Sequence, residues 1–163
     1  AGAAHHHGAR ASGLAPPAYP VGKAGEHRLQ HAGTALRVEL PADLPQVFGD
    51  EHEIEQVVLN LFLNSLDALE QQGRPGAITV TGSAVRAGAE RRVQLVVEDD
   101  GPGMAPEDLA RVMDPFFTKK ERPDASGLGM FISFSIVQNH GGAMTVESAP
   151  GRGFRTVLQL PPA

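Results

Sequence analysis

The segment from residue 51 to residue 72 constrains the fold of this chain most, because helical periodicity there lies between a start signal and a stop signal. Asp50 followed by Glu53 is typical of a capping box, and Gly73 is typical of a helix C-terminus. The positions that recur at helical spacing are apolar apart from one serine: Ile54, Val57, Val58, Leu61, Ser65, Leu66 and Leu69. The sequence therefore predicts a long helix that buries one face against another layer.

Alternating stretches on both sides of this helix predict that layer. One strand is expected over 36–40, an antiparallel pair over 77–85 and 92–98, and a terminal hairpin of 144–148 with 154–160. Shorter helices are expected near 26–33, over 106–113 and over 128–140. Helices on one face of a mixed, mostly antiparallel sheet make an α+β fold, a two-layer α/β sandwich.

Composition limits the domain organisation and the function classes. Residues 1–25 are rich in Ala, Gly and Pro and lack acidic residues, so we expect a disordered linker or leader there, with His5, His6 and His7 a vector-derived tag. One catalytic domain is expected over 26–162. The absence of cysteine excludes disulfides and zinc-thiolate sites, and the net charge of -5 argues against a nucleic-acid partner.

Two asparagines on the long helix are the first candidate functional residues. Asn60 and Asn64 lie one turn apart on one face, with Gln56 before them and Asp67 after them. Asn is a poor helix former, and solvent exposure explains one such residue better than a pair. Amide oxygens suit Mg²⁺ that is bound mainly through phosphates, so the pair could hold a metal-phosphate group.

Two glycine motifs are also candidates for ligand contact. Asp99-x-Gly101-x-Gly103 follows an apolar strand, so its carboxylate could accept a hydrogen bond from an amino group such as that of adenine. On its own, this motif is better explained by an ordinary turn. Gly127-Leu128-Gly129 opens a helix whose free N–H groups favour a phosphate. Neither a Walker P-loop nor a strand-linked GxGxxG is present.

Taken together and in order, the motifs resemble the catalytic ATP-binding domain of bacterial sensor histidine kinases over residues 26–162. They are Gln56-x3-Asn60-x3-Asn64-Ser65-x-Asp67-Ala68, Asp99-x-Gly101-x-Gly103, Asp114-Pro115-Phe116-Phe117-Thr118-Lys119-Lys120, Gly127-Leu128-Gly129 and His140-Gly141-Gly142. The resemblance implies a Bergerat-type ATP site, in the superfamily that includes DNA gyrase, mismatch-repair ATPases and heat-shock chaperone ATPases.

The resemblance also implies a role for each matching residue. Asn60 and Asn64 would be the catalytic and metal-binding residues, and Asp99 would bind adenine. The remaining residues expected at the nucleotide are Asp67, Gly101, Gly103, Phe116, Phe117, Lys119, Lys120, Gly127, Leu128 and Gly129. Phe116 and Phe117 would anchor a lid over 118–126, one of the two lysines could reach a phosphate or be simply solvated, and His140 would be structural at a helix end.

The resemblance further implies a kinase that uses ATP and Mg²⁺. The ATP-hydrolysing branches carry a Glu at the position of Asn60, and an amide is no general base. The expected reaction is transfer of the γ-phosphoryl group to a histidine on a separate dimerisation domain, whose product serves a response regulator. Alternatives are an anti-sigma-factor-type serine kinase and a non-catalytic ATP-binding module.

Departures from the family pattern suggest a fragment of a larger protein. Ala125-Ser126 replaces the common Gly-Thr, and no phosphoacceptor helix is visible, because His27 and His31 lack a following acidic residue. We expect an excised domain that is cytoplasmic, monomeric when isolated and without membrane contact. Its parent kinase could be anchored in the inner membrane.

Overall fold

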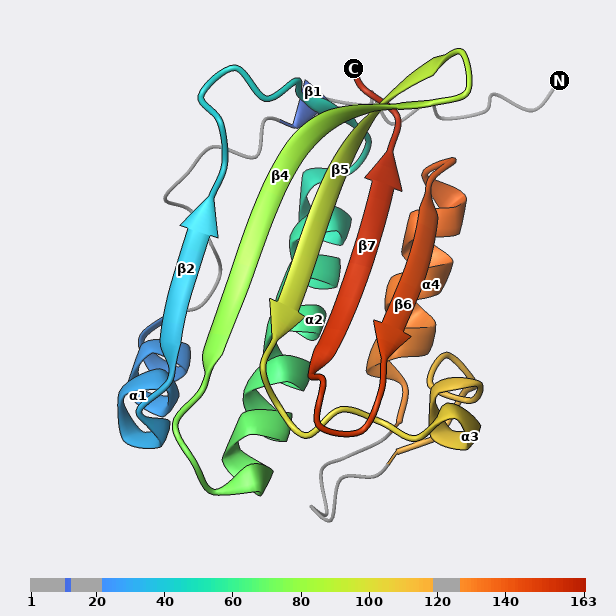
Figure 1. The fold of residues 1–163 in the computed structure, drawn as a ribbon. Coiled ribbons are helices and arrows are strands. Elements are labelled where there is room, and N and C mark those ends of the chain that lie inside the picture. Colours follow the sequence, from blue (N-terminus) through green and yellow to red (C-terminus); the bar gives the residue numbers. More distant parts are fainter. Residues whose placement is uncertain (1–10, 13–21, 119–126) are drawn as a thin grey trace, which may run out of the picture.

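A five-stranded sheet forms the centre of the computed structural model, which describes residues 11–12, 22–118 and 127–163 (Figure 1). The strand order is β2-β4-β5-β7-β6. Strands β2 and β4 are parallel and the other neighbours are antiparallel. The strands are β2 (Ala35–Glu39), β4 (Ala77–Ala87), β5 (Glu90–Asp99), β6 (Ala143–Ser148) and β7 (Phe154–Leu160). The predicted mixed, mostly antiparallel sheet is therefore confirmed.

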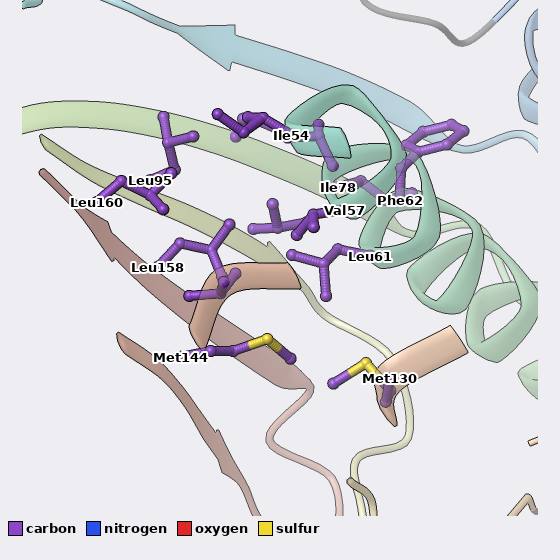
Figure 2. Close-up of a cluster of buried hydrophobic side chains, with 14 of the residues drawn as sticks. Ile54, Val57, Leu61, Phe62, Ile78, Leu95, Met130, Met144, Leu158 and Leu160 are labelled. Carbon is purple, nitrogen blue, oxygen red and sulfur yellow. The ribbon is translucent and has the colours of Figure 1, made fainter. Parts of the chain in front are cut away.

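Helices cover one face of this sheet. They are α1 (Gly22–Ala32), α2 (Glu51–Gln72), α3 (Pro106–Leu109) and α4 (Gly129–Asn139). Both α2 and α4 lie against the sheet, while α1 lies beside the end of β2 (Figure 1). Apolar side chains of α2 point toward those of the strands, as Figure 2 shows for Leu61 and Leu158, which are 2% and 0% exposed. The predicted α+β two-layer sandwich is confirmed.

The N-terminus of α2 begins where the sequence predicts but is capped differently. The Asp50 side chain accepts a hydrogen bond from the backbone N–H of Glu53 at 3.1 Å, which is one half of the predicted capping box. The Asp50 backbone N–H, which a full box gives to Glu53, donates instead to Nε2 of His140 at 3.1 Å. The second half of the predicted box is therefore wrong, because a residue from α4 takes its place.

Three local features differ from the sequence-based expectation. Helix α1 begins at Gly22 rather than near residue 26, and α3 ends at Leu109, after which the chain forms turns. After Leu109 the backbone N–H groups of Arg111 and Val112 donate to carbonyls three residues earlier, so the segment continues as turns. A short strand β1 (Ala11–Ser12) pairs with β3 (Val47–Phe48) outside the main sheet. Among the described residues, no helix combines the length and the apolarity needed to cross a membrane.

Candidate functional site

Helix α2 carries the two predicted asparagines one turn apart, and Asn60 contacts α4. Asn60 and Asn64 are both half-buried, so solvent exposure does not account for the pair. Nδ2 of Asn60 donates a hydrogen bond to Oγ of Ser133 on α4 at 3.3 Å. Gln56, at the start of the same polar stripe, is exposed. The stripe therefore runs from solvent into the region between the two helices.

Strand β5 delivers Asp99 to the edge of the core. Its alternate residues Val93, Leu95 and Val97 face the helices, and Asp99 continues this series as the last residue of the strand with 9% exposure. Oδ1 of Asp99 accepts a hydrogen bond from the backbone N–H of Gly101 at 2.9 Å. Oδ2 is buried and has no hydrogen-bond partner among the described residues. A buried carboxylate oxygen without a donor is costly, which is a feature of ligand sites.

The surroundings of Asp99 raise its pKa. Burial is the main cause, and it outweighs the lowering by the neighbouring Ser65 hydroxyl and by the backbone N–H groups of Gly101 and Phe154. Ser65 follows Asn64 on α2, so this hydroxyl joins the helix of the asparagine pair to the end of β5. Sequence reasoning assigned Ser65 no role in the site. The available signal was a polar residue at a core-facing position of an otherwise apolar series.

The glycines after Asp99 allow the chain to turn closely around that carboxylate. A Cβ on Gly101 would lie 2.7 Å from Oδ1 of Asp99. Gly103 has a φ of 71°, and a side chain there would collide with the backbone carbonyl of Ala149 in the β6–β7 turn. The fold itself thus requires glycine at position 103, whereas a side chain at position 101 would press on the Asp99 carboxylate.

The start of α4 combines an uncapped N-terminus with open space. No side chain of the described residues caps this helix at Leu128, so its first N–H groups remain available. A Cβ on Gly129 would have no described atom within 4 Å. Gly127 has a φ of 70° and packs against the backbone of Phe116. This helix start offers N–H donors and room for a phosphate.

Phe116 and Phe117 lie just before the predicted lid and make different contacts. The Phe116 side chain is 73% exposed, and its backbone, at a φ of 67°, donates an N–H···O bond to Gly127 at 3.0 Å. The guanidinium of Arg111 lies 4.8 Å from the ring centroid of Phe117. Phe116 therefore joins the two ends of the loop through its backbone and not through its ring. The predicted residues Lys119 and Lys120 lie outside the described residues.

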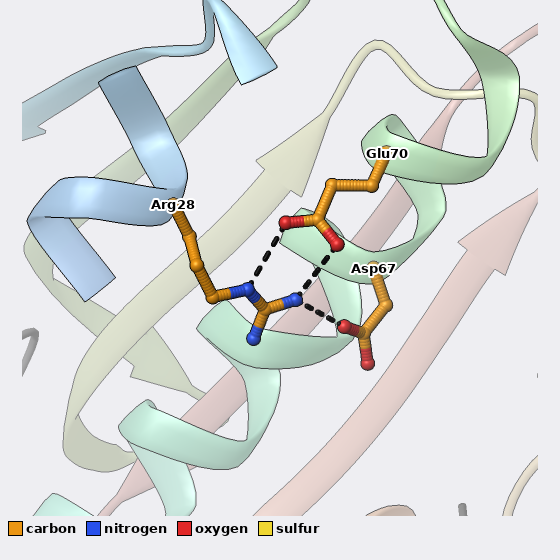
Figure 3. Close-up of polar contacts among 3 residues, drawn as sticks. All are labelled: Arg28, Asp67 and Glu70. Carbon is orange, nitrogen blue, oxygen red and sulfur yellow. Dashed lines mark hydrogen bonds and ion pairs between the residues drawn. The ribbon is translucent and has the colours of Figure 1, made fainter. Parts of the chain in front are cut away.

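Asp67 has a protein partner that the sequence did not suggest. Figure 3 shows Arg28 of α1 reaching both Asp67 and Glu70 of α2, with NH2 at 2.6 Å from Asp67 and 2.9 Å from Glu70. The hydrogen bonds with Glu70, and secondarily those with Asp67, raise the pKa of Arg28. The buried charge of Asp67 is thus balanced within the protein. The ion pairs hold α1 against α2, and the contact of Asp67 with the nucleotide stays a prediction.

His140 ends α4 and fastens it to α2. Nδ1 donates to the carbonyl of Ile136 at 2.8 Å, which leaves Nε2 unprotonated to accept from the Asp50 N–H. Gly49 packs so closely on the imidazole that a side chain there would collide with it. These contacts agree with the predicted structural role of His140. No group of three or more His, Asp or Glu side chains in the described part of the chain could hold a metal by itself.

The fold and the site together are typical of one class of domain. A helix-covered mixed sheet, an amide pair on the longest helix, a buried aspartate at a strand end and an uncapped helix N-terminus together are typical of a nucleotide-binding α+β sandwich. The model of the family described as histidine kinase-, DNA gyrase B- and HSP90-like ATPase matches residues 49–163. The chain belongs to this family, which confirms the resemblance based on the motifs.

Individual relatives narrow the similarity to sensor histidine kinases. The sensor histidine kinase ZraS of Klebsiella oxytoca is 41% identical over 118 residues, which are 72% of this chain and 24% of that protein. The C4-dicarboxylate transport sensor protein DctB of Rhizobium meliloti (strain 1021) is 40% identical over 116 residues, 71% of this chain and 18% of that protein. The chain thus spans a quarter or less of the length of these two relatives.

Solved structures show the same fold. Full-length ShkA in complex with AMPPNP has a TM-score of 0.69 at 30% identity, and the match covers 84% of this chain and 27% of that chain. A nucleotide-free form of the catalytic domain of histidine kinase ThkA has a TM-score of 0.70 at 26% identity, with 84% of each chain covered. The predicted Bergerat-type sandwich is the fold of histidine kinase catalytic domains.

Proposed function

We propose that this chain is the ATP-binding catalytic domain of a two-component sensor histidine kinase. It transfers the γ-phosphoryl group of Mg-ATP to a histidine on a separate dimerisation domain of its parent protein. The observation that carries the proposal is the Asp99 carboxylate, which is 9% exposed with Oδ2 unpartnered among the described residues. This carboxylate adjoins the turn of α2 that holds Ser65 and Asn64.

The adenine end of the nucleotide fits the surroundings of Asp99. The exocyclic amino group of adenine is a donor, and Oδ2 of Asp99 is a buried acceptor that lacks one. Gly101 and Gly103 carry no side chains that would keep a flat base from the backbone. We assign base recognition to these three residues.

The phosphate end fits the region between α2 and α4. Asn60 and Asn64 supply amide oxygens for Mg²⁺, a hard cation that keeps part of its water when it binds with phosphates. The bound cation would neutralise charge on the phosphate oxygens. Gly127, Leu128 and Gly129 place the uncapped N-terminus of α4 for contact with the phosphates. Lys119 and Lys120 remain proposed phosphate contacts.

Phosphoryl transfer suits these residues better than ATP hydrolysis does. Transfer depends mainly on positioning and on charge stabilisation, and a histidine acceptor provides its own nucleophile. Hydrolysis needs an activated water, and the amide of Asn60 has no useful basicity. The partners that follow from this reaction are the phosphoacceptor domain of the parent kinase and a response regulator. We place the domain in the cytoplasm.

A phosphotransfer experiment tests the proposal against its two alternatives. In separate reactions, the chain is mixed with γ-labelled ATP and with one of two acceptors: the separately expressed phosphoacceptor domain of its parent protein, or a sigma-regulator protein. We expect a label that acid removes and alkali does not, as for phosphohistidine. An acid-stable label on serine of a regulator protein would favour the serine kinase, and ATP binding without transfer to either acceptor would favour a regulatory module.

A further inference from the structure

A buried serine on α4 contacts the asparagine pair. Ser133 is 0% exposed and lies on the core-facing side of α4, together with the buried residues Met130 and Val137. A hydroxyl at such a position costs free energy unless it is hydrogen-bonded. The amide of Asn60 satisfies it, because Nδ2 donates to Oγ of Ser133 at 3.3 Å.

A second serine of α4 makes a different contact. Ser135 is partly exposed, and its hydroxyl donates to the backbone carbonyl of Phe131 at 2.9 Å. Bonding to the preceding turn of its own helix is the ordinary solution for a serine within a helix. Ser133 instead faces α2, where the half-buried Asn60 meets it.

The contact places the nitrogen end of the Asn60 amide at Ser133. An amide carries a donor nitrogen and an acceptor oxygen, and only the oxygen can ligate a cation. Because Nδ2 donates to Ser133, the oxygen of the same amide points away from Ser133. The opposite orientation would present N–H groups to a cation and would repel it.

We infer that Ser133 is a positioning residue that orients the Asn60 amide so that its oxygen serves the metal-phosphate end of the nucleotide. This inference rests on the proposed function, in which Asn60 belongs to that end. Ser133 lies one helical turn after Gly129, so the same α4 that offers its N-terminus to the phosphates also orients an amide on α2. The Ser133 hydroxyl thus links α2 and α4, the two helices proposed to contact the phosphates.

Ser133→Ala tests the inference because it removes only the hydroxyl and places a better helix former in α4. The affinity for AMPPNP is measured by calorimetry on the 163-residue chain, with and without Mg²⁺, together with the affinity for adenosine. Removing a partner that orients a metal ligand lowers affinity by about 10- to 100-fold, and we expect roughly 10-fold for this uncharged bond. The loss should appear with Mg-AMPPNP and not with adenosine. Ser135→Ala is the matched control and should leave all three affinities unchanged.

A double-mutant cycle separates positioning from general damage to the fold. In an Asn60→Ala background, Ser133→Ala should cause no further loss, because the side chain that it orients is already absent. A readout without ligand is the side-chain NH2 resonance of Asn60, which should shift in Ser133→Ala and not in Ser135→Ala.

The possible failures have different meanings. Equal losses for Mg-AMPPNP and adenosine, or full additivity with Asn60→Ala, would overturn the positioning role. Unchanged Mg-AMPPNP affinity in Ser133→Ala beside a clear loss in Asn60→Ala would overturn it too, and would leave the proposed function intact. If Asn60→Ala itself had no effect on Mg-AMPPNP affinity or on phosphotransfer, the proposed role of Asn60 would fail and the inference with it.

Discussion

Replacing Asp99 by asparagine should weaken ATP binding without weakening the fold. The backbone N–H of Gly101 donates to Oδ1 of Asp99, so the amide oxygen of the variant will occupy that position. Its nitrogen then replaces Oδ2, which is the atom without a partner among the described residues. The variant would therefore present a donor to the adenine amino group, where the unmodified chain presents an acceptor.

The size of the effect follows from the bond that is lost. A hydrogen bond to a charged group contributes about 1.5–3 kcal/mol. At about 1.4 kcal/mol for each factor of ten, the dissociation constant for ATP should rise by roughly 10- to 150-fold. Calorimetric titration measures this change. Asp100→Asn is the matched control, because Asp100 is exposed and its Oδ1 accepts from the N–H of Ala77 at 2.7 Å, a bond that an asparagine oxygen can keep.

The same substitution should raise the free energy of unfolding, although it weakens ATP binding. Burial raises the pKa of Asp99, so its contribution to the free energy of unfolding is fully present below the unfolded-state pKa of about 3.9. It is lost as the pH rises through the higher folded-state pKa. The stability gained by Asp99→Asn should therefore grow with pH across this window, as measured by thermal unfolding. A folded Asp99→Asn chain that binds ATP with unchanged affinity would refute the assignment of Asp99 to the base.

Three further predictions concern the metal end, the reaction and the packing of α1. Asn64→Ala should reduce Mg-dependent ATP affinity far more than adenosine affinity in calorimetry, and equal losses would indicate general damage to α2. The unmodified chain alone should turn over ATP extremely slowly in a phosphate-release assay, and Asn60→Glu should raise that rate by only part of the 10²–10⁴-fold typical of a general base. Rapid hydrolysis by the unmodified chain, abolished by Asn64→Ala, would contradict the kinase assignment. Arg28→Ala should lower the free energy of unfolding by about 1–3 kcal/mol in urea, because it removes the charged donor from the buried carboxylate of Asp67. The side chains of Arg28 and Asp67 are 28% and 6% exposed. The exposed His27→Ala is the control, and equal stability of the two variants would show that the ion pair contributes nothing measurable.

Local patterns in the sequence were sufficient for the elements and for the order of the motifs. Helix α2 begins and ends at the predicted residues, because Asp50 and Gly73 cap it through contacts with nearby residues of the same helix. The β4–β5 and β6–β7 hairpins follow from alternation of apolar residues along each strand. Each of these signals depends on residues a few positions apart, and periodicity reports such relations well.

Local patterns did not predict the end of α3 or the start of α1 correctly. After Leu109 the backbone bonds span three residues and not four, and the periodicity over 106–113 does not distinguish such turns from an α-helix. Helix α1 is held by the ion pairs of Arg28 with α2, which no property of its own residues reveals. Propensity is a weak guide wherever a tertiary contact stabilises a short helix.

The sequence by itself determined that the chain has an α+β sandwich with an amide pair on its main helix and an aspartate at the end of a strand. Only the tertiary structure decided which groups meet: Asp99 lies near Ser65, Asn60 bonds Ser133, and Asp50 bonds His140. Each pair joins residues that are far apart in the chain. Periodicity shows which face of an element is buried, but the partner of a polar side chain depends on how two elements dock.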